Sequence, residues 1–401
     1  MTAREEDMAG DETAGAASAP CGRGGRRPTV LVLRALGLGD VLTSVPALRA
    51  LRRGFPGHEI VLAGPASLAA VTGATGAVDR MLPTRAPGRE VPAELPWSGP
   101  PPELAVDLHG CGPLSHRLLE RTGAGALWAF RHADMPALDG PRWRPDEHER
   151  ERWCRLLRWY GLTADPDELC IPAPTVPSPA PGAVVLHPGA DSGARRWPAE
   201  RYAAVAGALR RAGQRVVVTA GPGEEAAAAA VASRAGLSPA EVLGGPEGVP
   251  FARLCALLAR SRCVVVGDTG IAHLASALGA RSVVLFGPVS PRLWGPPTAG
   301  PHRSLWHPFP GDDPLRPGDP HGTTPDPRLL RVSVEEVLGA VESLTGRAGG
   351  TAGAVLSGDT PRPHDSGRPG GAGSLGGEQP AGGGCPEGKG GRAAGPVRTG
   401  S

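Results

Sequence analysis

The sequence predicts an α/β protein built from two doubly wound domains that face each other across a cleft. Short apolar runs alternate with longer helical patterns, this alternation occurs twice, and a proline-dense stretch separates the two sets. Alternating strand and helix patterns are typical of parallel sheets covered by helices. A chain of 401 residues is long enough for each set to bury a core of its own.

The first domain is predicted over residues 28–162. Its first strand, over residues 29–34, has the near-continuous hydrophobicity of a buried parallel strand. A helix is expected next over residues 41–53, with Val41, Val45 and Leu48 on one face. Further strands are expected over 59–63, 78–82, 104–108 and 127–130, and a Trp-containing helix over 147–160.

Residues 163–182 are predicted to form an extended linker, because six prolines in this stretch disfavour both helices and central strands. The second domain is expected over residues 183–332, followed by a terminal helix at 333–345. Its predicted strands lie at 183–187, 215–219, 241–243, 263–266 and 282–286. Its predicted helices lie at 198–211, 224–234, 250–259 and 269–278, and a proline-rich loop fills 287–326.

Both ends of the chain are predicted to be disordered, over residues 1–27 and 346–401, because they hold too few large apolar side chains to form a core. The net charge of +2 gives no electrostatic case for a nucleic-acid partner, and we expect at most peripheral membrane association. No signal segment or membrane span is recognised, and the seven cysteines form no C-x-x-C pair. Unpaired thiols and a cytoplasmic location are therefore expected.

The first turn between strand and helix carries the first candidate site. Gly37 and Gly39 let the backbone turn tightly and approach a ligand, and Asp40 follows at the start of the helix. Asp40 either acts at the mouth of the cleft or caps its helix. A dinucleotide fingerprint would need a third glycine where Leu42 stands, so a nicotinamide cofactor is not predicted.

The second candidate opens the second domain, where a strand ends at His187 and a glycine-containing loop leads to Arg195 and Arg196. Either arginine can bind phosphate oxygens through charge-assisted hydrogen bonds, or the pair is simply solvated. Glu224 follows the next strand, where it either accepts hydrogen bonds from ribose hydroxyls or favours the start of a helix.

The most informative candidate is the junction from Gly267 to His273, where a buried strand runs directly into a helix. Asp268 or Thr269 can cap this helix, and its first-turn N–H groups, beginning near Gly270, form an anion site. His273 either touches a phosphate or packs between the domains. Gly287 and Pro288 follow the last predicted strand in a rigid loop able to line the same pocket.

Taken together, these segments resemble glycosyltransferase family 9, the ADP-heptose:lipopolysaccharide heptosyltransferases, which have the GT-B fold. The resemblance runs in the same order from about Thr29 to Leu344. It is carried by Gly39-Asp40 with Pro46-Ala-Leu48, His187-Pro-Gly189 with Arg-Arg-Trp-Pro198, Gly221-Pro-Gly-Glu224, Asp268-Thr-Gly-Ile-Ala-His273, Phe286-Gly-Pro288 and Trp294-Gly-Pro296.

The resemblance implies that Asp40 is the general base of an inverting sugar transfer. It implies that Arg195, with Arg196 as its competitor, contacts donor phosphate and that Glu224 binds the donor nucleoside. Further donor contacts are implied for His187, Asp268, Thr269, Gly270, His273, Gly287 and Pro288, with Gly37 and Gly39 on the acceptor side.

The expected donor is an ADP-sugar or another nucleotide-sugar carrying a heptose or related hexose. The expected acceptor is a hydroxyl of a glycan, glycolipid or small molecule. No cofactor is required, and no metal is predicted, because no carboxylate cluster has metal-ligand spacing. Two alternatives remain open: a nucleotide-sugar epimerase of the same fold, and a non-catalytic nucleotide-sugar-binding protein.

Overall fold

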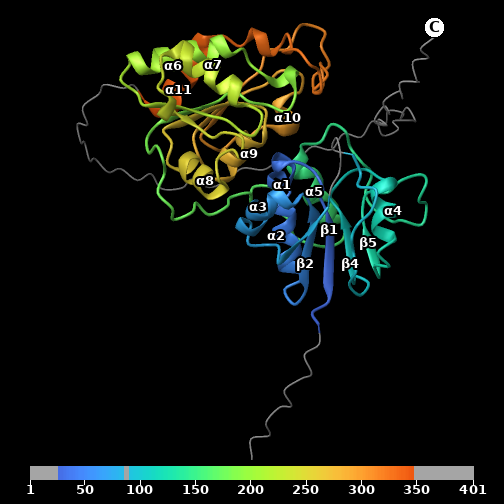
Figure 1. The fold of residues 1–401 in the computed structure, drawn as a ribbon. Coiled ribbons are helices and arrows are strands. Elements are labelled where there is room, and N and C mark those ends of the chain that lie inside the picture. The colour runs from blue at the N-terminus through green and yellow to red at the C-terminus, as the bar shows by residue number, and fades with distance from the viewer. Residues whose placement is uncertain (1–25, 85–89, 347–401) are drawn as a thin grey trace, which may run out of the picture.

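The computed structural model describes residues 26–84 and 90–346, which form two parallel sheets flanked by helices (Figure 1). The predicted disordered ends lie outside the described residues, apart from Arg26, Arg27 and Gly346. Two doubly wound halves face each other, as the sequence predicts.

The N-terminal half contains a five-stranded parallel sheet in the order β3-β2-β1-β4-β5. The central strand β1 pairs with β2 on one side and with β4 on the other. The strands are β1 (Thr29–Leu33), β2 (Glu59–Gly64), β3 (Arg80–Pro83), β4 (Leu104–Asp107) and β5 (Ala126–Trp128). The helices are α1 (Leu38–Thr43), α2 (Val45–Gly54), α3 (Ala69–Ala74), α4 (Leu114–Glu120) and α5 (Glu149–Trp159).

The C-terminal half contains a six-stranded parallel sheet in the order β11-β10-β9-β6-β7-β8. Its strands are β6 (Val184–His187), β7 (Val216–Thr219), β8 (Val242–Leu243), β9 (Cys263–Gly267), β10 (Ser282–Leu285) and β11 (His302–Leu305). Its helices are α6 (Ala199–Arg211), α7 (Glu225–Ala235), α8 (Phe251–Ala259), α9 (Gly270–Ala277), α10 (Pro291–Trp294) and α11 (Val334–Thr345).

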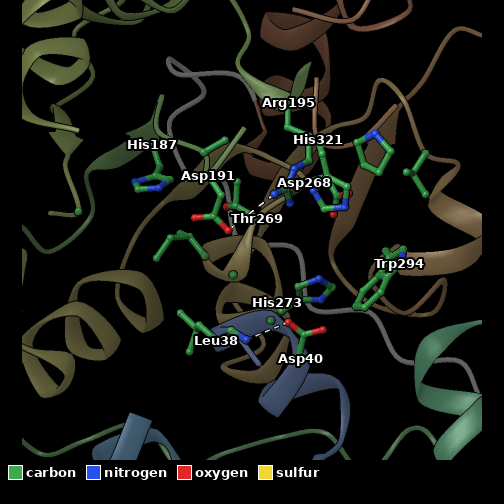
Figure 2. Close-up of a pocket in the computed structure, with 18 of the residues that line it drawn as sticks. Leu38, Asp40, His187, Asp191, Arg195, Asp268, Thr269, His273, Trp294 and His321 are labelled. Carbon is green, nitrogen blue, oxygen red and sulfur yellow. Dashed lines mark hydrogen bonds and ion pairs between the residues drawn. The ribbon is translucent and has the colours of Figure 1, made fainter. Parts of the chain in front are cut away.

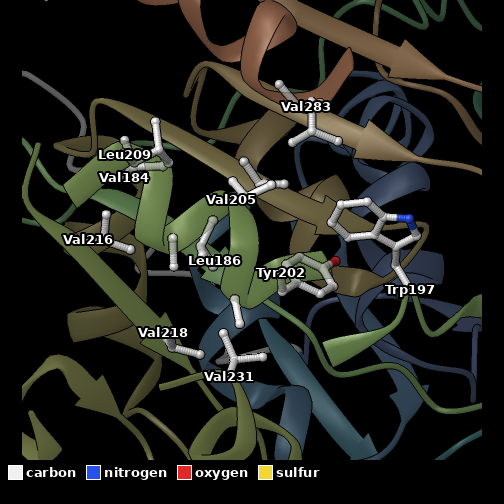
Figure 3. Packing of buried hydrophobic residues seen from close by; sticks show 14 of the residues in the cluster. Val184, Leu186, Trp197, Tyr202, Val205, Leu209, Val216, Val218, Val231 and Val283 are labelled. Carbon is white, nitrogen blue, oxygen red and sulfur yellow. The ribbon is translucent and has the colours of Figure 1, made fainter. Parts of the chain in front are cut away.

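Apolar packing secures both faces of the C-terminal sheet. On one face, β-branched strand residues pack under α6, α7 and α11, and Trp197 lies edge-on to Tyr202 with ring centroids 5.0 Å apart (Figure 3). The cluster on the other face includes α8 and α9 and also Val41, Leu42 and Val71 from the N-terminal half. The contact between the halves is therefore partly a continuous apolar core.

The structure corrects two element predictions. The single helix expected over residues 41–53 is broken at Ser44, because Pro46 has no N–H to donate to the preceding turn and begins the new helix α2 instead. The loop expected over residues 287–326 contains α10 and the edge strand β11. Only Leu305 in β11 is a large aliphatic residue, so this strand gives no apolar run to detect.

The short helices α3 and α4 were also not anticipated from the sequence. Among the cysteines, Cys154, Cys170, Cys255 and Cys263 are free, as their spacing predicts. Cys111 is disulfide-bonded, which corrects the prediction of an unpaired thiol there.

Candidate active site

A cavity of about 410 Å³ lies where the two halves meet (Figure 2). Of the described residues in the N-terminal half, those at 37–40, in the turn after β1 and the start of α1, line it. The C-terminal half lines it with loops that follow β6, β7, β9 and β10, together with a later segment near residues 316–321. Its volume lies in the range of about 300–1,000 Å³ that is typical of small-molecule sites.

Most of the predicted site residues reach this cavity from separate places in the sequence. Those that line it are Gly37, Gly39, Asp40, His187, Arg195, Glu224, Asp268, Thr269, Gly270 and His273. They meet because the loops after parallel strands emerge at the same edge of each sheet.

Arg196, Gly287 and Pro288 do not line the cavity. The Arg196 Nε donates a hydrogen bond to the carbonyl of Ala190 at 2.9 Å, which folds this side chain back onto its own loop. The carbonyls of Gly287 and Pro288 accept hydrogen bonds from Trp306 Nε1 and from the N–H of Gly318. These three residues therefore shape the loops around the cavity.

Other lining residues were not singled out from the sequence. Leu38, Ala190, Asp191, Gly221, Ile271, Val289 and Trp294 lie within or beside the recognised motifs, whereas Arg316, Pro320 and His321 come from the proline-rich segment. Adjacency to the motifs was the available signal for the first group. Arg316, Pro320 and His321 gave no such signal, because hydrogen bonds to distant residues set the path of their segment.

The Asp40 carboxylate closes the first turn of its helix and also lies at the cavity. Its Oδ2 accepts a hydrogen bond from the N–H of Gly37 at 3.1 Å, which closes the first turn of α1. Its Oδ1 lies 3.6 Å from Arg34 Nη2, and the residue also lines the cavity. The carboxylate is therefore 4% exposed and fixed in orientation at the cleft.

Arg34 lies behind Asp40 and is fully buried. Its Nε donates to the Asp40 carbonyl at 3.0 Å, and its Nη2 pairs with Glu149 at 2.9 Å. Burial raises the pKa of Glu149, but Arg34 and Arg152 outweigh that effect and hold the pKa below its usual value. An ionised carboxylate on α5 thus anchors the arginine that supports Asp40.

The amino end of α9 faces Asp40 from the C-terminal half (Figure 2). Thr269 occupies the capping position, but its side chain makes no capping hydrogen bond, and its buried Oγ1 has no hydrogen-bond partner. A buried hydroxyl without a partner is costly. Because Thr269 lines the cavity, a ligand oxygen would satisfy it there.

Two glycines allow α1 to touch α9. A Cβ on Gly39 would lie 2.7 Å from His273 Cδ2, and a Cβ on Gly270 would lie 2.9 Å from the Leu38 Cβ. Both distances are shorter than real Cβ contacts, so only glycine permits this approach. Gly39 thus allows α1, which carries Asp40, to lie against the amino end of α9.

His273 is enclosed at this contact. Its ring meets Trp294 edge-on with centroids 5.9 Å apart. Burial, followed by the nearby His148 and Arg150, lowers the pKa of His273 to about 3, so the ring is neutral near pH 7. A neutral imidazole packed between the halves fits one of the two roles considered for this residue and also borders the cavity.

Glu224 and His187 also line the cavity and lie close together. The Glu224 Oε2 accepts a hydrogen bond from the N–H of Gly221 at 2.7 Å and lies 3.5 Å from His187 Nε2. The His187 Nδ1 lies 3.1 Å from the Thr219 hydroxyl. Burial lowers the pKa of His187 despite the opposing charge of Glu224.

Arg195 connects two loops of the C-terminal half. Its Nε donates to Ser192 Oγ at 3.3 Å, its Nη1 donates to the carbonyl of Asp268 at 3.0 Å, and its Nη2 lies 3.7 Å from Asp191. Each guanidinium nitrogen therefore already faces a protein oxygen.

Within residues 26–84 and 90–346, no group of three or more His, Cys, Asp or Glu side chains is placed to hold a metal ion. No helix in that part of the chain is long and apolar enough to cross a membrane.

Residues 172–305 match the family model of glycosyltransferase family 9 (heptosyltransferase). These residues carry a family 9 glycosyltransferase domain. No curated protein sequence matches the chain.

Solved structures resemble this chain over both halves. A family 9 glycosyl transferase from Veillonella parvula is 20% identical, with a TM-score of 0.62, over 80% of this chain and 97% of that one. The ADP-heptose LPS heptosyltransferase II of E. coli is 19% identical, with a TM-score of 0.60, over 79% and 98%. The E. coli heptosyltransferase WaaC with ADP is 20% identical, with a TM-score of 0.58, over 79% and 99%. These likenesses confirm the predicted GT-B fold.

Proposed function

We propose that this glycosyltransferase moves a sugar from a nucleotide-sugar to an acceptor hydroxyl with inversion, using Asp40 as general base. One observation carries the proposal. A fixed carboxylate from one half and the amino end of α9 from the other line a single cavity of about 410 Å³. The first suits proton removal and the second suits a departing diphosphate.

In this mechanism, Asp40 takes the proton of the acceptor hydroxyl while the hydroxyl oxygen bonds to the anomeric carbon of the donor. The bond from that carbon to the diphosphate oxygen breaks, and the nucleoside diphosphate leaves with the electron pair. A single displacement inverts the anomeric carbon. General-base assistance of this kind contributes about 10²–10⁴-fold to rate.

The charge that develops on the leaving diphosphate is stabilised by the first-turn N–H groups of α9 and by the Thr269 hydroxyl. The buried Thr269 Oγ1 has no protein partner, which supports a ligand oxygen at this place. Glu224 is held from behind by the N–H of Gly221, and its carboxylate is assigned to the ribose hydroxyls of the donor.

The proposed donor is an ADP-sugar carrying a heptose or related hexose. Support comes from similar structures, described as the E. coli heptosyltransferase WaaC with ADP and with ADP-2-deoxy-2-fluoro heptose. The acceptor is a hydroxyl of a glycan, glycolipid or small molecule, and neither a metal nor another cofactor takes part. We place the reaction in the cytoplasm, with at most peripheral association with a membrane.

The test incubates the full chain with a panel of nucleoside-diphosphate sugars, with and without candidate acceptors, and follows the products by mass spectrometry. Transfer should release a nucleoside diphosphate and add one sugar to the acceptor, with an inverted anomeric configuration by NMR. An altered sugar in the absence of acceptor would show an epimerase instead. Binding without any turnover over the whole panel would show a non-catalytic binding protein.

A further inference from the structure

Residues 312–322, here called the strap, line part of the cavity with Arg316, Pro320 and His321. The carbonyl of Leu315 accepts a hydrogen bond from the N–H of Ser290 at 2.8 Å, and the N–H of Gly318 donates to the carbonyl of Pro288 at 3.1 Å. At its other end, the carbonyl of Pro320 accepts a hydrogen bond from the Ser192 hydroxyl at 2.6 Å. The strap is thus fixed to the loops that follow β10 and β6, on either side of α9.

Two aspartates shape the strap from within. Asp313 Oδ1 accepts hydrogen bonds from the N–H groups of Leu315 and Arg316 at 2.8 and 2.7 Å. Asp319 Oδ1 accepts one from the N–H of His321 at 2.9 Å. Such turns fix the backbone direction at the residues they close. Both side chains that follow, Arg316 and His321, line the cavity.

Figure 2 places His321 beside Arg195 and Asp268, at the end of the cavity occupied by the amino terminus of α9. The strap therefore adds basic side chains around the place proposed for the donor diphosphate.

The two arginines that line the cavity differ in what their guanidinium groups contact. Arg195 is engaged by Ser192, Asp268 and Asp191. The Arg316 guanidinium makes no hydrogen bond or ion pair within residues 26–84 and 90–346, and the residue is exposed. Of the two, Arg316 has its donors available for a ligand.

Arg316 also lies within electrostatic reach of the N-terminal half. Burial is the largest influence on the pKa of Arg152, near the start of α5, and lowers it. Glu149 and Glu147 oppose this effect, and the positive charges of Arg34 and Arg316 add to it. The Arg316 charge is therefore felt at α5 of the N-terminal half.

We propose that Arg316 is the side chain that binds the donor diphosphate and neutralises it as it leaves, whereas Arg195 is a positioning residue that holds the β6 loop against α9. This deepens the proposed function and rests on it for the identity of the ligand. It also reassigns the phosphate contact that the sequence resemblance gave to Arg195. A guanidinium matches phosphate oxygens with two parallel hydrogen bonds, and each bond is charge-assisted.

The experiment measures binding by calorimetry with inorganic pyrophosphate and with ADP, UDP, GDP and CDP as probes, set against the matching nucleosides. Arg316→Ala should lower the affinity for pyrophosphate, and for the nucleoside diphosphate that the protein binds, by about 10- to 100-fold. The affinity for the matching nucleoside should change by less than about twofold. Arg316→Lys should recover part of the lost affinity, because lysine keeps the positive charge but cannot donate two parallel hydrogen bonds. Arg211→Ala, at an exposed site at the end of α6, is the matched control and should bind like the unaltered protein.

Arg195→Ala separates the two assigned roles. It should lower the thermal unfolding midpoint, and at a temperature where it remains folded its pyrophosphate affinity should fall less than that of Arg316→Ala. Equal diphosphate affinity of Arg316→Ala and the unaltered protein overturns the proposal. So does a failure of the unaltered protein to bind any of these probes.

Failure of the Arg316 assignment and failure of the proposed function give different results. If Arg316→Ala loses diphosphate binding and no sugar is transferred under any condition, the arginine assignment stands and the transfer reaction fails. If transfer proceeds and Arg316→Ala retains its donor KM and kcat, the reaction stands and the arginine assignment fails.

Discussion

The two halves of the molecule share one architecture but contribute very differently to the cavity. The C-terminal half lines it with the ends of four strands and with the strap, and hydrogen bonds within that half hold these loops together. Among the described residues of the N-terminal half, 37–40 alone line it, beside the central strand. The C-terminal side of the cavity is thus a network of loops, whereas the described part of the N-terminal half reaches the cavity at one place.

The family match follows the same division of the molecule. The match over residues 172–305 begins just before the C-terminal sheet and covers all six of its strands, and it includes none of the N-terminal sheet. Under the proposed function, the half with several cavity-lining loops holds the donor, and the other half supplies the carboxylate of Asp40.

Asp40→Asn gives the sharpest test of the contribution from the N-terminal half. Turnover should fall by about 10²–10⁴-fold, because an amide accepts no proton from the acceptor hydroxyl. Diphosphate affinity should stay within about twofold, since the proposed diphosphate contacts belong to the other half. Initial rates of transfer and calorimetry measure the two quantities, with Asp146→Asn, an exposed aspartate of the same half, as control. Retention of full turnover would remove Asp40 from the reaction.

Glu149→Gln tests the buried support behind Asp40. The substitution removes the carboxylate that the buried Arg34 and Arg152 share, and breaking a buried ion pair in this way typically costs about 3–5 kcal/mol of unfolding free energy. Urea denaturation measures the loss. The control is Glu151→Gln on the same helix, whose partner Arg158 is 43% exposed, where the loss should be below about 1 kcal/mol. Equal losses in the two variants would contradict an anchoring role for Glu149.

Gly39→Ala probes the contact between the halves, because the added Cβ would lie 2.7 Å from His273 Cδ2. A misplacement of about 1 Å at a reacting centre costs as much as about 10²-fold in rate, so kcat/KM should fall by about 10- to 100-fold. Diphosphate binding should be unchanged.

The matched control for this substitution is Gly73→Ala, a helical glycine of α3 whose added Cβ would have open space around it. Its kcat/KM should equal that of the unaltered protein. A similar rate in the Gly39 and Gly73 variants would show that the approach of α1 to α9 has no part in transfer.

A smaller effect is expected from the second contact between the halves, where His148 Nε2 donates to the carbonyl of Gly295 at 3.0 Å. Burial, and then the charge of Arg150, lowers the pKa of His148 from 6.5 to about 4. The unfolded chain therefore takes up a proton between those values that the folded protein does not. Stability from this group is complete above pH 6.5 and is lost as the pH falls towards 4, by at most about 1.4 kcal/mol per pH unit.

His148→Gln keeps an N–H donor for Gly295 but removes the titration. Its unfolding free energy should depend less steeply on pH than that of the unaltered protein between pH 6.5 and 4. Chemical denaturation at several pH values measures the difference. Identical slopes would show that groups other than His148 cause the pH dependence of stability in this range.

The sequence predicted the fold where local patterns and tertiary structure agree. The strands β1, β6, β7, β9 and β10 are continuous apolar runs, because both faces of each sheet are covered, and their periodicity is visible without a structure. The edge strand β11 is half polar and exposed, and it forms through pairing with β10, so its own residues give little signal. Motifs at strand ends likewise brought most of the candidate residues to one cavity.

Contacts between distant residues account for what the sequence missed. Arg34 and Glu149 lie 115 positions apart, and nothing near either residue indicates the other. The strap depends on backbone hydrogen bonds to Pro288 and Ser290 and on the Ser192 hydroxyl, which composition does not encode. The proline-rich stretch over residues 287–326 therefore has the sequence pattern of an irregular loop, although Arg316 within it lines the cavity.

The central position of β1 has a consequence for how such a protein diversifies. The strands β2, β3, β4 and β5 flank it, and the described residues that follow these strands do not line the cavity. Asp40 is held by the turn after β1, through Gly37, and by Arg34, which in turn bonds Glu149 on α5 and the carbonyl of Leu108 after β4. Under the proposed function, substitutions after β2 and β5 can change acceptor contacts and leave these bonds in place.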